Sequence, residues 1–332
     1  MKLSFPAYYN NFRCIAADCP DSCCKAWTVD VDPAAAAYYR QLPGALGERL
    51  RQVLQDTDDG TILAIENGRC PMWLDNGLCR IQSELGHDAL CKTCRDFPRL
   101  RHDYGDFVEL GLELSCPEAA RLILTAKEYT TVQQTVPGGE DPEYDPQVMD
   151  ALLESRRHAL ALLDDGRYPL PEKLAILLLY AHQVQGQIDG GDEAPFLPEE
   201  CLSLSRKYAT NGDLGCVLEL FRNLEILTAQ WAERLNKPAK VPSWAASYKE
   251  LVRYLIGRYW LQAVSDFDLV CRVKFIIASC ILTVSLGGDP ICTAQLFSKE
   301  IENDPDNLVF LLNAAYSSPA LTDMNLLGLL LA

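Results

Sequence analysis

The sequence predicts a mostly α-helical protein, with a small cysteine-rich N-terminal domain of little regular structure and an all-helical C-terminal domain. Nine of the 14 cysteines lie in the first 116 residues. Beyond residue 147, apolar residues recur with the period of about 3.6 that marks amphipathic helices. Residues 137–146, between these parts, contain three prolines, two glycines and four acidic residues. Such a segment neither continues a helix nor packs in a core.

We place the domain boundary in this segment, so residues 1–136 form the first predicted domain and residues 147–332 the second. Residues 1–32 lack helical periodicity and are interrupted by prolines, which predicts an ordered loop that something other than a hydrophobic core must hold. The rest of the first domain shows helical patterns from Pro33 and over residues 45–55 and 118–127, and strand patterns over Thr61–Glu66 and Phe107–Leu114.

The run Ser115-Cys116-Pro117-Glu118 is typical of a helix start, with a proline in the first turn and an acidic residue near the positive end of the helix dipole. Cys116 therefore lies where a thiolate is favoured.

The second domain is predicted to contain helices over residues 147–163, 171–188, 199–209, 213–236, 244–264, 267–285, 289–301 and 305–316. The most apolar stretch, Leu269–Leu286, carries Arg272 and Lys274. The remaining uncharged run is too short for the roughly 20 residues of a membrane span, so we interpret it as a buried core helix.

The formal net charge is −16, from 30 basic and 46 acidic residues. This balance disfavours binding to nucleic acid or to an anionic membrane, and it is compatible with a lysine-bearing protein partner. The N-terminal residues have no apolar segment of the secretory type, so we expect a cytoplasmic protein.

In the reducing cytoplasm, clustered cysteines indicate metal or catalytic chemistry and not disulfides. Eight are candidate metal ligands: Cys14, Cys19, Cys23, Cys24, Cys70, Cys79, Cys94 and Cys116. Their short spacings allow one loop to turn several thiolates toward one centre. Cys91 is left open between ligand and structural thiol. The centre is an iron–sulfur cluster or, alternatively, zinc, with His87 as a further possible zinc ligand.

Cys91 and Cys94 also form a CxxC pair, which is compatible with a redox dithiol, although the βαβ pattern of such proteins is missing. Basic residues surround this pair, and among them Arg95 and Arg99 are candidates for holding the carboxylate of a cofactor beside the metal. The alternative for this patch is ion pairing with Asp96, Asp103 and Asp106. The other five cysteines, Cys201, Cys216, Cys271, Cys280 and Cys292, lie on apolar helical patterns and are expected in the core.

Six motifs within residues 5–120 resemble the flagellin lysine-N-methylase family: Phe12-Arg-Cys14, Cys19-x3-Cys23-Cys24-Lys25-x-Trp27, Cys70-Pro71, Cys79-Arg80-Ile81-Gln82, Cys94-Arg95-x-Phe97-Pro98-Arg99 and Ser115-Cys116-Pro117. The resemblance continues more loosely over Tyr248–Ser279. That family is related to proteins with a CxxCxxCC zinc- or iron-chelating motif, from which the wider spacing here departs.

The resemblance implies methylation of flagellin lysines, S-adenosylmethionine as the methyl donor and an iron–sulfur cluster, which we expect to be of the 4Fe-4S type. The residues themselves show no glycine-rich loop after a strand and no C-x3-C-x2-C triplet, so neither common mode of binding this donor is evident. No catalytic base can be named. The alternative is a non-enzymatic adaptor whose N-terminal domain is held by zinc or a cluster.

Overall fold

The computed structural model describes residues 1–25, 27–127, 130–193, 195–237 and 244–331. The strands are β1 (Lys2–Pro6), β2 (Val29–Val31), β3 (Leu54–Thr57), β4 (Gly60–Leu63), β5 (Arg99–Asp103), β6 (Phe107–Leu112) and β7 (Thr131–Thr135). The α-helices of the N-terminal part are α1 (Pro33–Gln41), α2 (Gly44–Val53), α3 (Arg80–Leu85), α4 (Lys92–Asp96) and α5 (Pro117–Leu124).

The remainder is helical. It contains α6 (Pro146–Asp164), α7 (Leu170–Ile188), α8 (Pro198–Tyr208), α9 (Leu214–Arg222), α10 (Ala229–Asn236), α11 (Ser247–Tyr259), α12 (Leu269–Leu286), α13 (Pro290–Phe297), α14 (Pro305–Ala314) and α15 (Asp323–Leu331). The 3-10 helix η4 (Trp260–Val264) continues α11, and the π-helix η5 (Ser298–Glu302) continues α13.

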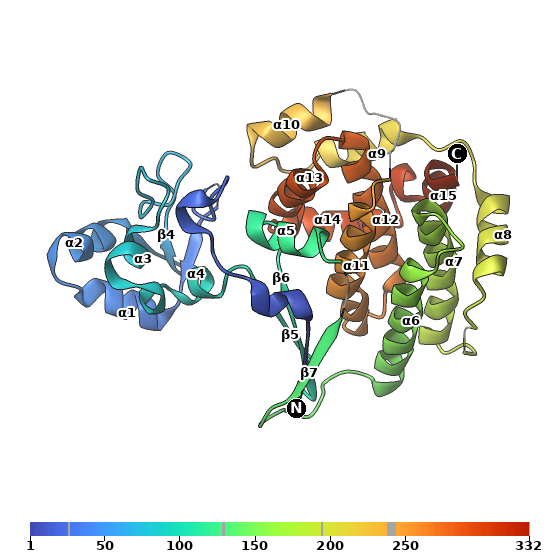
Figure 1. The fold of residues 1–332 in the computed structure, drawn as a ribbon, viewed down its shortest axis with the longest axis horizontal. Coiled ribbons are helices and arrows are strands. Elements are labelled where there is room, and N and C mark those ends of the chain that lie inside the picture. Colours follow the sequence, from blue (N-terminus) through green and yellow to red (C-terminus); the bar gives the residue numbers. More distant parts are fainter. Residues whose placement is uncertain (26, 128–129, 194, 238–243, 332) are drawn as a thin grey trace.

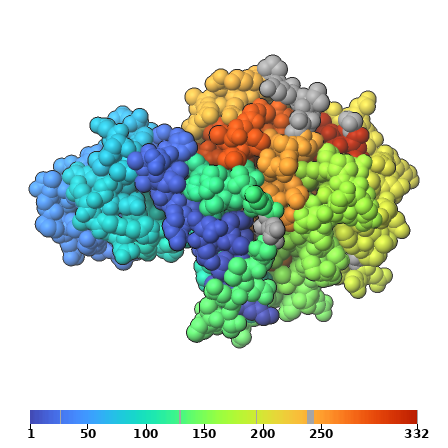
Figure 2. All heavy atoms as spheres, viewed as in Figure 1, coloured from blue at the N-terminus to red at the C-terminus, as the bar shows by residue number. Residues whose placement is uncertain are grey.

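A small lobe holds α1 to α4 and a three-stranded sheet in the order β2-β4-β3. Its core is formed by Val31, Tyr39, Leu50, Leu63 and neighbouring apolar side chains, together with Cys70 and Cys91. Figure 2 shows this lobe protruding from the rest of the molecule. The lobe is therefore stabilised by few large apolar side chains, and buried thiols contribute to its interior.

A four-stranded sheet in the order β5-β6-β1-β7 lies between the small lobe and the helices (Figure 1). β1 pairs parallel with β6 and antiparallel with β7, while β5 and β6 form an antiparallel pair. In this register, Ser4 of β1 lies opposite Glu109 of β6 on one side and Gln133 of β7 on the other, and His102 of β5 lies opposite Glu109. Because directly opposite residues point to the same face, four polar side chains form one row across the sheet.

The large core joins the helices to part of the N-terminal region, since it includes Leu112, Leu114 and Ile123 as well as the C-terminal helices. Helix α12 contacts α7, α11, α13 and α15. It is long and apolar enough to span a membrane, but 94% of it is buried inside the protein. The prediction of a buried core helix over Leu269–Leu286 is confirmed. The boundary predicted at residues 137–146 stays a prediction.

The mostly helical fold class is confirmed, and most predicted helices begin within a few residues of the observed ones. The expectation of little regular structure before residue 137 is wrong, because the seven strands lie there. Local patterns revealed only the strands around Thr61 and Phe107; β1 and β7 are short, and each finds its partners far away in the sequence. Helices α3, α4 and α15 were not predicted.

The single helix predicted over residues 213–236 is two helices, α9 and α10. Tertiary hydrogen bonds hold the break. The carboxylate of Glu300 in η5 accepts from the backbone N–H of Leu227 at 2.8 Å and from the hydroxyl of Thr228. Thr228 in turn caps α10 by accepting from the N–H of Trp231. These bonds satisfy groups that a continuous helix would satisfy internally.

Candidate functional site

Six N-terminal cysteines interact with one another and form what we call the six-cysteine group: Cys23, Cys24, Cys70, Cys79, Cys91 and Cys94. Their thiols come from four separate segments of the chain. The backbone N–H of Cys70 donates to the carbonyl of Cys24 at 2.7 Å, which ties the first segment to the second. Cys79 lies at the N-terminus of α3 and Cys91 at the N-terminus of α4.

Asp32 fixes the position of α4 relative to α1. One carboxylate oxygen accepts from the N–H of Ala35, which caps α1, and the other accepts from the N–H of Lys92 at 2.7 Å. Tyr39 of α1 adds a second link, because its hydroxyl donates to the carbonyl of Ala89 at 2.8 Å. The α1 helix is therefore the support on which the Cys91–Cys94 segment is held.

Hydrogen bonds between thiols shift their pKa values strongly. The pKa of Cys91 is lowered to about 7 because its thiolate accepts a hydrogen bond from Cys94. The same bond, with burial, raises the pKa of Cys94. The pKa of Cys24 is raised to about 12: its hydrogen bond with Cys23 lowers it, but the bond with Cys70 and burial outweigh that effect. Cys91 is thus the thiol of the group whose lowered pKa most favours the thiolate near neutral pH.

Cys14, Cys19 and Cys116 form a second, three-cysteine group, and Cys19 also interacts with Cys23 of the first. Cys116 precedes α5, as predicted, with Pro117 in the first turn. The expected thiolate is not favoured there, since the pKa of Cys116 is raised to about 12. Burial outweighs the hydrogen bonds from the backbone of Ala119 and Glu118.

All eight predicted ligands belong to these two groups, and Cys91, which the sequence left open, lies in the larger one. Among the residues that the structure describes, no three cysteine, histidine or acidic side chains are arranged so that they could hold one metal ion. The thiols therefore gather without reaching ligand geometry.

The remaining cysteines only partly fulfil the expectation of core positions. Cys201, Cys271 and Cys280 are buried, whereas Cys216 is half-buried and Cys292 is exposed. Cys292 lies in the first turn of α13, where its backbone N–H is held by the capping carboxylate of Asp289. The buried residues of α13 begin at Thr293, one position after Cys292.

The helical part of the protein contacts the cysteine loop through Asp21. Its carboxylate accepts from the ammonium of Lys299 in η5 at 3.0 Å and from the amide of Gln295 in α13 at 3.2 Å. Gln295 also donates to the carbonyl of Ser115, next to Cys116. Lys299 lies over the ring of Trp27 at 5.1 Å. Two residues of one helical segment thus hold both the Cys19–Cys23 loop and the start of α5.

The predicted basic patch is largely neutralised by its neighbours. Lys92 pairs with Asp96, and Arg101 pairs with Asp103 at 2.6 Å. Arg95 lies 3.9 Å from Asp96, and Arg99 stacks over the ring of Phe12 at 5.2 Å. Lys92 and Arg101 therefore form the ion pairs that the sequence offered as the alternative for this patch. A cofactor role for Arg95 and Arg99 stays a prediction.

A buried charged network lies beside the sheet. Glu302 of η5 is fully buried and accepts from the hydroxyls of Tyr254 and Tyr259 at 3.1 and 2.8 Å. The guanidinium of Arg258 lies 3.5 Å from the same carboxylate and donates to Tyr254. Burial raises the pKa of both tyrosines well above the usual value, so both remain protonated donors.

A cavity of about 710 Å³ lies between the polar face of the four-stranded sheet and helices α6 and α11. It is lined by the His102, Glu109, Ser4 and Gln133 row and by Arg258. Sequence reasoning missed this site. The available signal was the polar residues at alternate positions in the strands, and the sequence revealed only one of these strands, the one that carries Glu109.

Comparison with known proteins finds relatives that are named lysine-N-methylase and flagellar biosynthetic protein FliU. It is 32% identical over 149 residues to the lysine-N-methylases of Salmonella choleraesuis and Salmonella typhimurium, an alignment that covers 39% of this chain and 36% of each relative. It is 34% identical over 132 residues to the flagellar biosynthetic protein FliU of Salmonella muenchen, and this alignment covers 75% of that protein. The chain belongs to the flagellin lysine-N-methylase family.

The family resemblance of the cysteine motifs is thus confirmed. This member of the flagellin lysine-N-methylase family spans about a third of the length of the two lysine-N-methylases that it matches. No family model matches the chain, and no solved structure matches it.

Proposed function

We propose that this protein is a lysine N-methyltransferase that modifies flagellin in the cytoplasm, with S-adenosylmethionine as donor and a cysteine-ligated iron–sulfur cluster. The observation that carries the proposal is the relationship to proteins named lysine-N-methylase and FliU. The acidic net charge supports it, because a chain of charge −16 attracts a lysine-bearing substrate.

The donor chemistry of the N-terminal part fits a cluster of this kind. Iron–sulfur clusters are held by thiolates, and nine thiols from distant segments gather in two adjoining groups. The ligands would come from the eight predicted cysteines and Cys91. When bound, the cluster would supply redox chemistry. The residues of the chain would exclude water and hold the loop through Asp21.

The test combines metal analysis with a methylation assay. Protein purified without oxygen is analysed for iron, sulfide and zinc, then mixed with S-adenosylmethionine, reductant and flagellin, and lysine methylation is followed by mass spectrometry. Methylated flagellin and stoichiometric iron are expected. A fully loaded protein that leaves flagellin unmodified would contradict the proposed activity.

Two cysteine variants assign the metal to its ligands. Cys24→Ser changes the thiol that interacts with Cys23, Cys70 and Cys79, so it should strongly reduce bound iron. The matched control is Cys292→Ser, an exposed cysteine of α13 outside both groups, which should retain full iron. Stoichiometric zinc in a colourless protein would instead favour the adaptor, for which the metal only stabilises the lobe.

A further inference from the structure

The cavity beside the four-stranded sheet is lined by polar side chains at a place where a sheet packed against helices is normally apolar. A sheet face covered by helices normally packs an apolar core. Here the covered face carries the row His102, Glu109, Ser4 and Gln133, and the space above it stays open. Its volume of about 710 Å³ lies within the range of roughly 300 to 1,000 Å³ typical of small-molecule sites.

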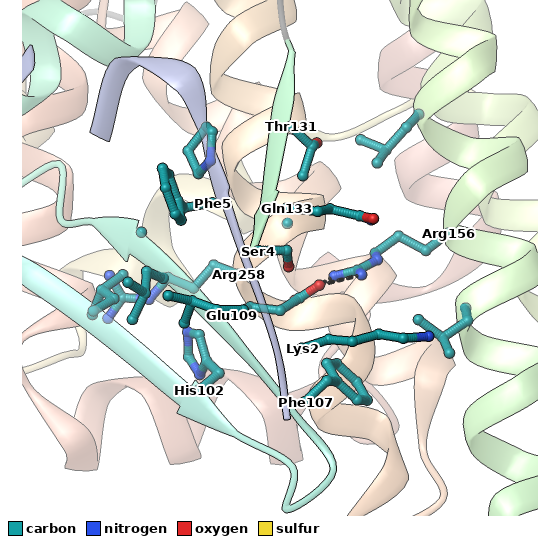
Figure 3. A pocket seen from close by; sticks show the side chains of 18 of the residues that line it. Lys2, Ser4, Phe5, His102, Phe107, Glu109, Thr131, Gln133, Arg156 and Arg258 are labelled. Carbon is teal, nitrogen blue, oxygen red and sulfur yellow. Dashed lines mark hydrogen bonds and ion pairs between the residues drawn. The ribbon is translucent and has the colours of Figure 1, made fainter. Parts of the chain in front are cut away.

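Glu109 joins the sheet to the helices across this space. Both of its carboxylate oxygens accept from the guanidinium of Arg156 in α6, at 2.6 and 2.7 Å (Figure 3). The two side chains are largely shielded from solvent, with 13% of Arg156 and 20% of Glu109 exposed. Such a bidentate pair fixes both charged groups in place before any ligand arrives.

His102 is one of the residues that line the cavity. Its Nε2 is buried within the wall and has no hydrogen-bond partner among the described residues. Buried polar atoms are rarely left without a partner, so this nitrogen is a candidate to hydrogen-bond a ligand that reaches the wall. Burial lowers the pKa of His102, and the nearby Arg258 lowers it further, so the ring is neutral at neutral pH.

The charges on the wall select the kind of ligand. Four cationic residues line the cavity, Lys2, Arg156, Arg253 and Arg258, against three acidic ones, Asp106, Glu109 and Asp150. Arg156, Arg253 and Arg258 are held in ion pairs with Glu109, Asp164 and Glu302, so the wall presents charges of both signs in fixed positions. It suits a ligand with a carboxylate and an ammonium better than a bare lysine side chain. The apolar wall formed by Phe107, Met149 and Leu160 offers a surface for a flat ring.

We propose that this cavity binds the S-adenosyl donor, with the amino-acid part facing the charged wall and the nucleoside within reach of His102. The inference rests on the proposed methyltransferase function and locates its donor. Arg95 and Arg99 do not line the cavity. The donor site therefore lies on the sheet and not in the basic patch near the thiols.

A cavity-filling variant tests this assignment. Gly257 of α11 lines the cavity, and a Cβ atom added there meets no neighbouring atom within 4 Å. Gly257→Leu should therefore place its side chain in the cavity without disturbing the fold, and leucine favours a helix more than glycine does. The matched control is Gly186→Leu in α7, a helical glycine that also has open space and does not line the cavity.

Binding of S-adenosylmethionine and S-adenosylhomocysteine to the full chain is measured by titration calorimetry, with melting temperature as a check of folding. Gly257→Leu should weaken the binding of both compounds by about tenfold or more, and His102→Leu should weaken it by several-fold. The control Gly186→Leu and the double variant Arg95→Ala/Arg99→Ala should bind both compounds as the natural protein does.

Unchanged binding to a folded Gly257→Leu variant, or no binding of either compound to the natural chain, would overturn the inference. Loss of binding in Arg95→Ala/Arg99→Ala alone would also overturn it. Cavity-dependent binding without methylation of flagellin would leave the donor site standing and reject the proposed activity.

Discussion

Lys299 and Asp21 form an ion pair of 3.0 Å between residues 278 positions apart in the sequence. Lys299 is 3% exposed and Asp21 is 25% exposed, so water screens the pair only partly. The pair joins the π-helix η5 to the loop that carries Cys19 and Cys23. The helical part of the protein therefore helps to position the thiols, although it supplies none of them.

Removal of Lys299 should loosen this loop. Lys299→Met removes the nearer of two cations that pair with the partly buried Asp21, the other being Lys25 at 3.5 Å, and we expect a loss of about 1–3 kcal/mol in the free energy of unfolding. Cys19 and Cys23 should also react faster with a thiol reagent in the metal-free protein. Mass spectrometry of labelled peptides measures the rate at each cysteine, and Lys207→Met on the surface is the control. Equal rates in both variants would show that the pair does not hold the loop.

The same contact predicts an acid-sensitive lobe. The pKa of Asp21 is lowered: burial alone would raise it, but the charge and hydrogen bond of Lys299 outweigh burial. The ionised Asp21 carboxylate therefore stabilises the folded protein fully above the unfolded-state pKa of about 3.9. This stabilisation is lost as the pH falls through the lower pKa of Asp21 in the folded state. Asp21→Asn should remove this pH-dependent contribution to the stability of the folded protein.

Thermal unfolding of both proteins between about pH 6 and pH 2.5 measures the difference. The difference in melting temperature between the natural protein and Asp21→Asn should be largest near pH 6 and should become smaller as the pH falls. Asp18→Asn, an exposed position of the same loop, is the control. A gap that does not change with pH would argue against the ion pair as its cause.

Glu302→Gln should be strongly destabilising. The substitution leaves Arg258 buried without its anion and weakens two tyrosine hydrogen bonds. Breaking a buried ion pair from one side costs about 3–5 kcal/mol. Urea unfolding followed by circular dichroism measures the loss. Glu154→Gln, in an exposed pair with Arg157, should change stability by no more than about 0.5 kcal/mol.

Glu300→Ala tests the break between α9 and α10. It removes the acceptor of the Leu227 N–H and the Thr228 hydroxyl, and an unsatisfied buried donor costs about 1–3 kcal/mol. Amide hydrogen exchange should become faster at residues 224–231 before it does elsewhere. Glu219→Ala, nearly one turn before the end of α9 and exposed, serves for comparison. Unchanged exchange at Leu227 would mean that Glu300 does not hold the break.

The sequence by itself determined most of the helices and the reactive residues. Caps and prolines mark the starts of helices such as α1, where Asp32 precedes Pro33, and α5, where Cys116 precedes Pro117. These signals act within a few residues of one another, so they can be read locally. The cysteine spacing likewise pointed to the eight predicted ligands, all of which lie in the two interacting groups.

Only the tertiary structure decided how distant segments meet. The strand β1 finds its partners near residues 107 and 135, and this pairing creates the polar row from His102 to Gln133. Glu300 breaks a helix about 70 residues away, and Lys299 holds a loop at the other end of the chain. The free energy of such contacts depends on groups that no local window contains, so residue patterns alone could not predict them.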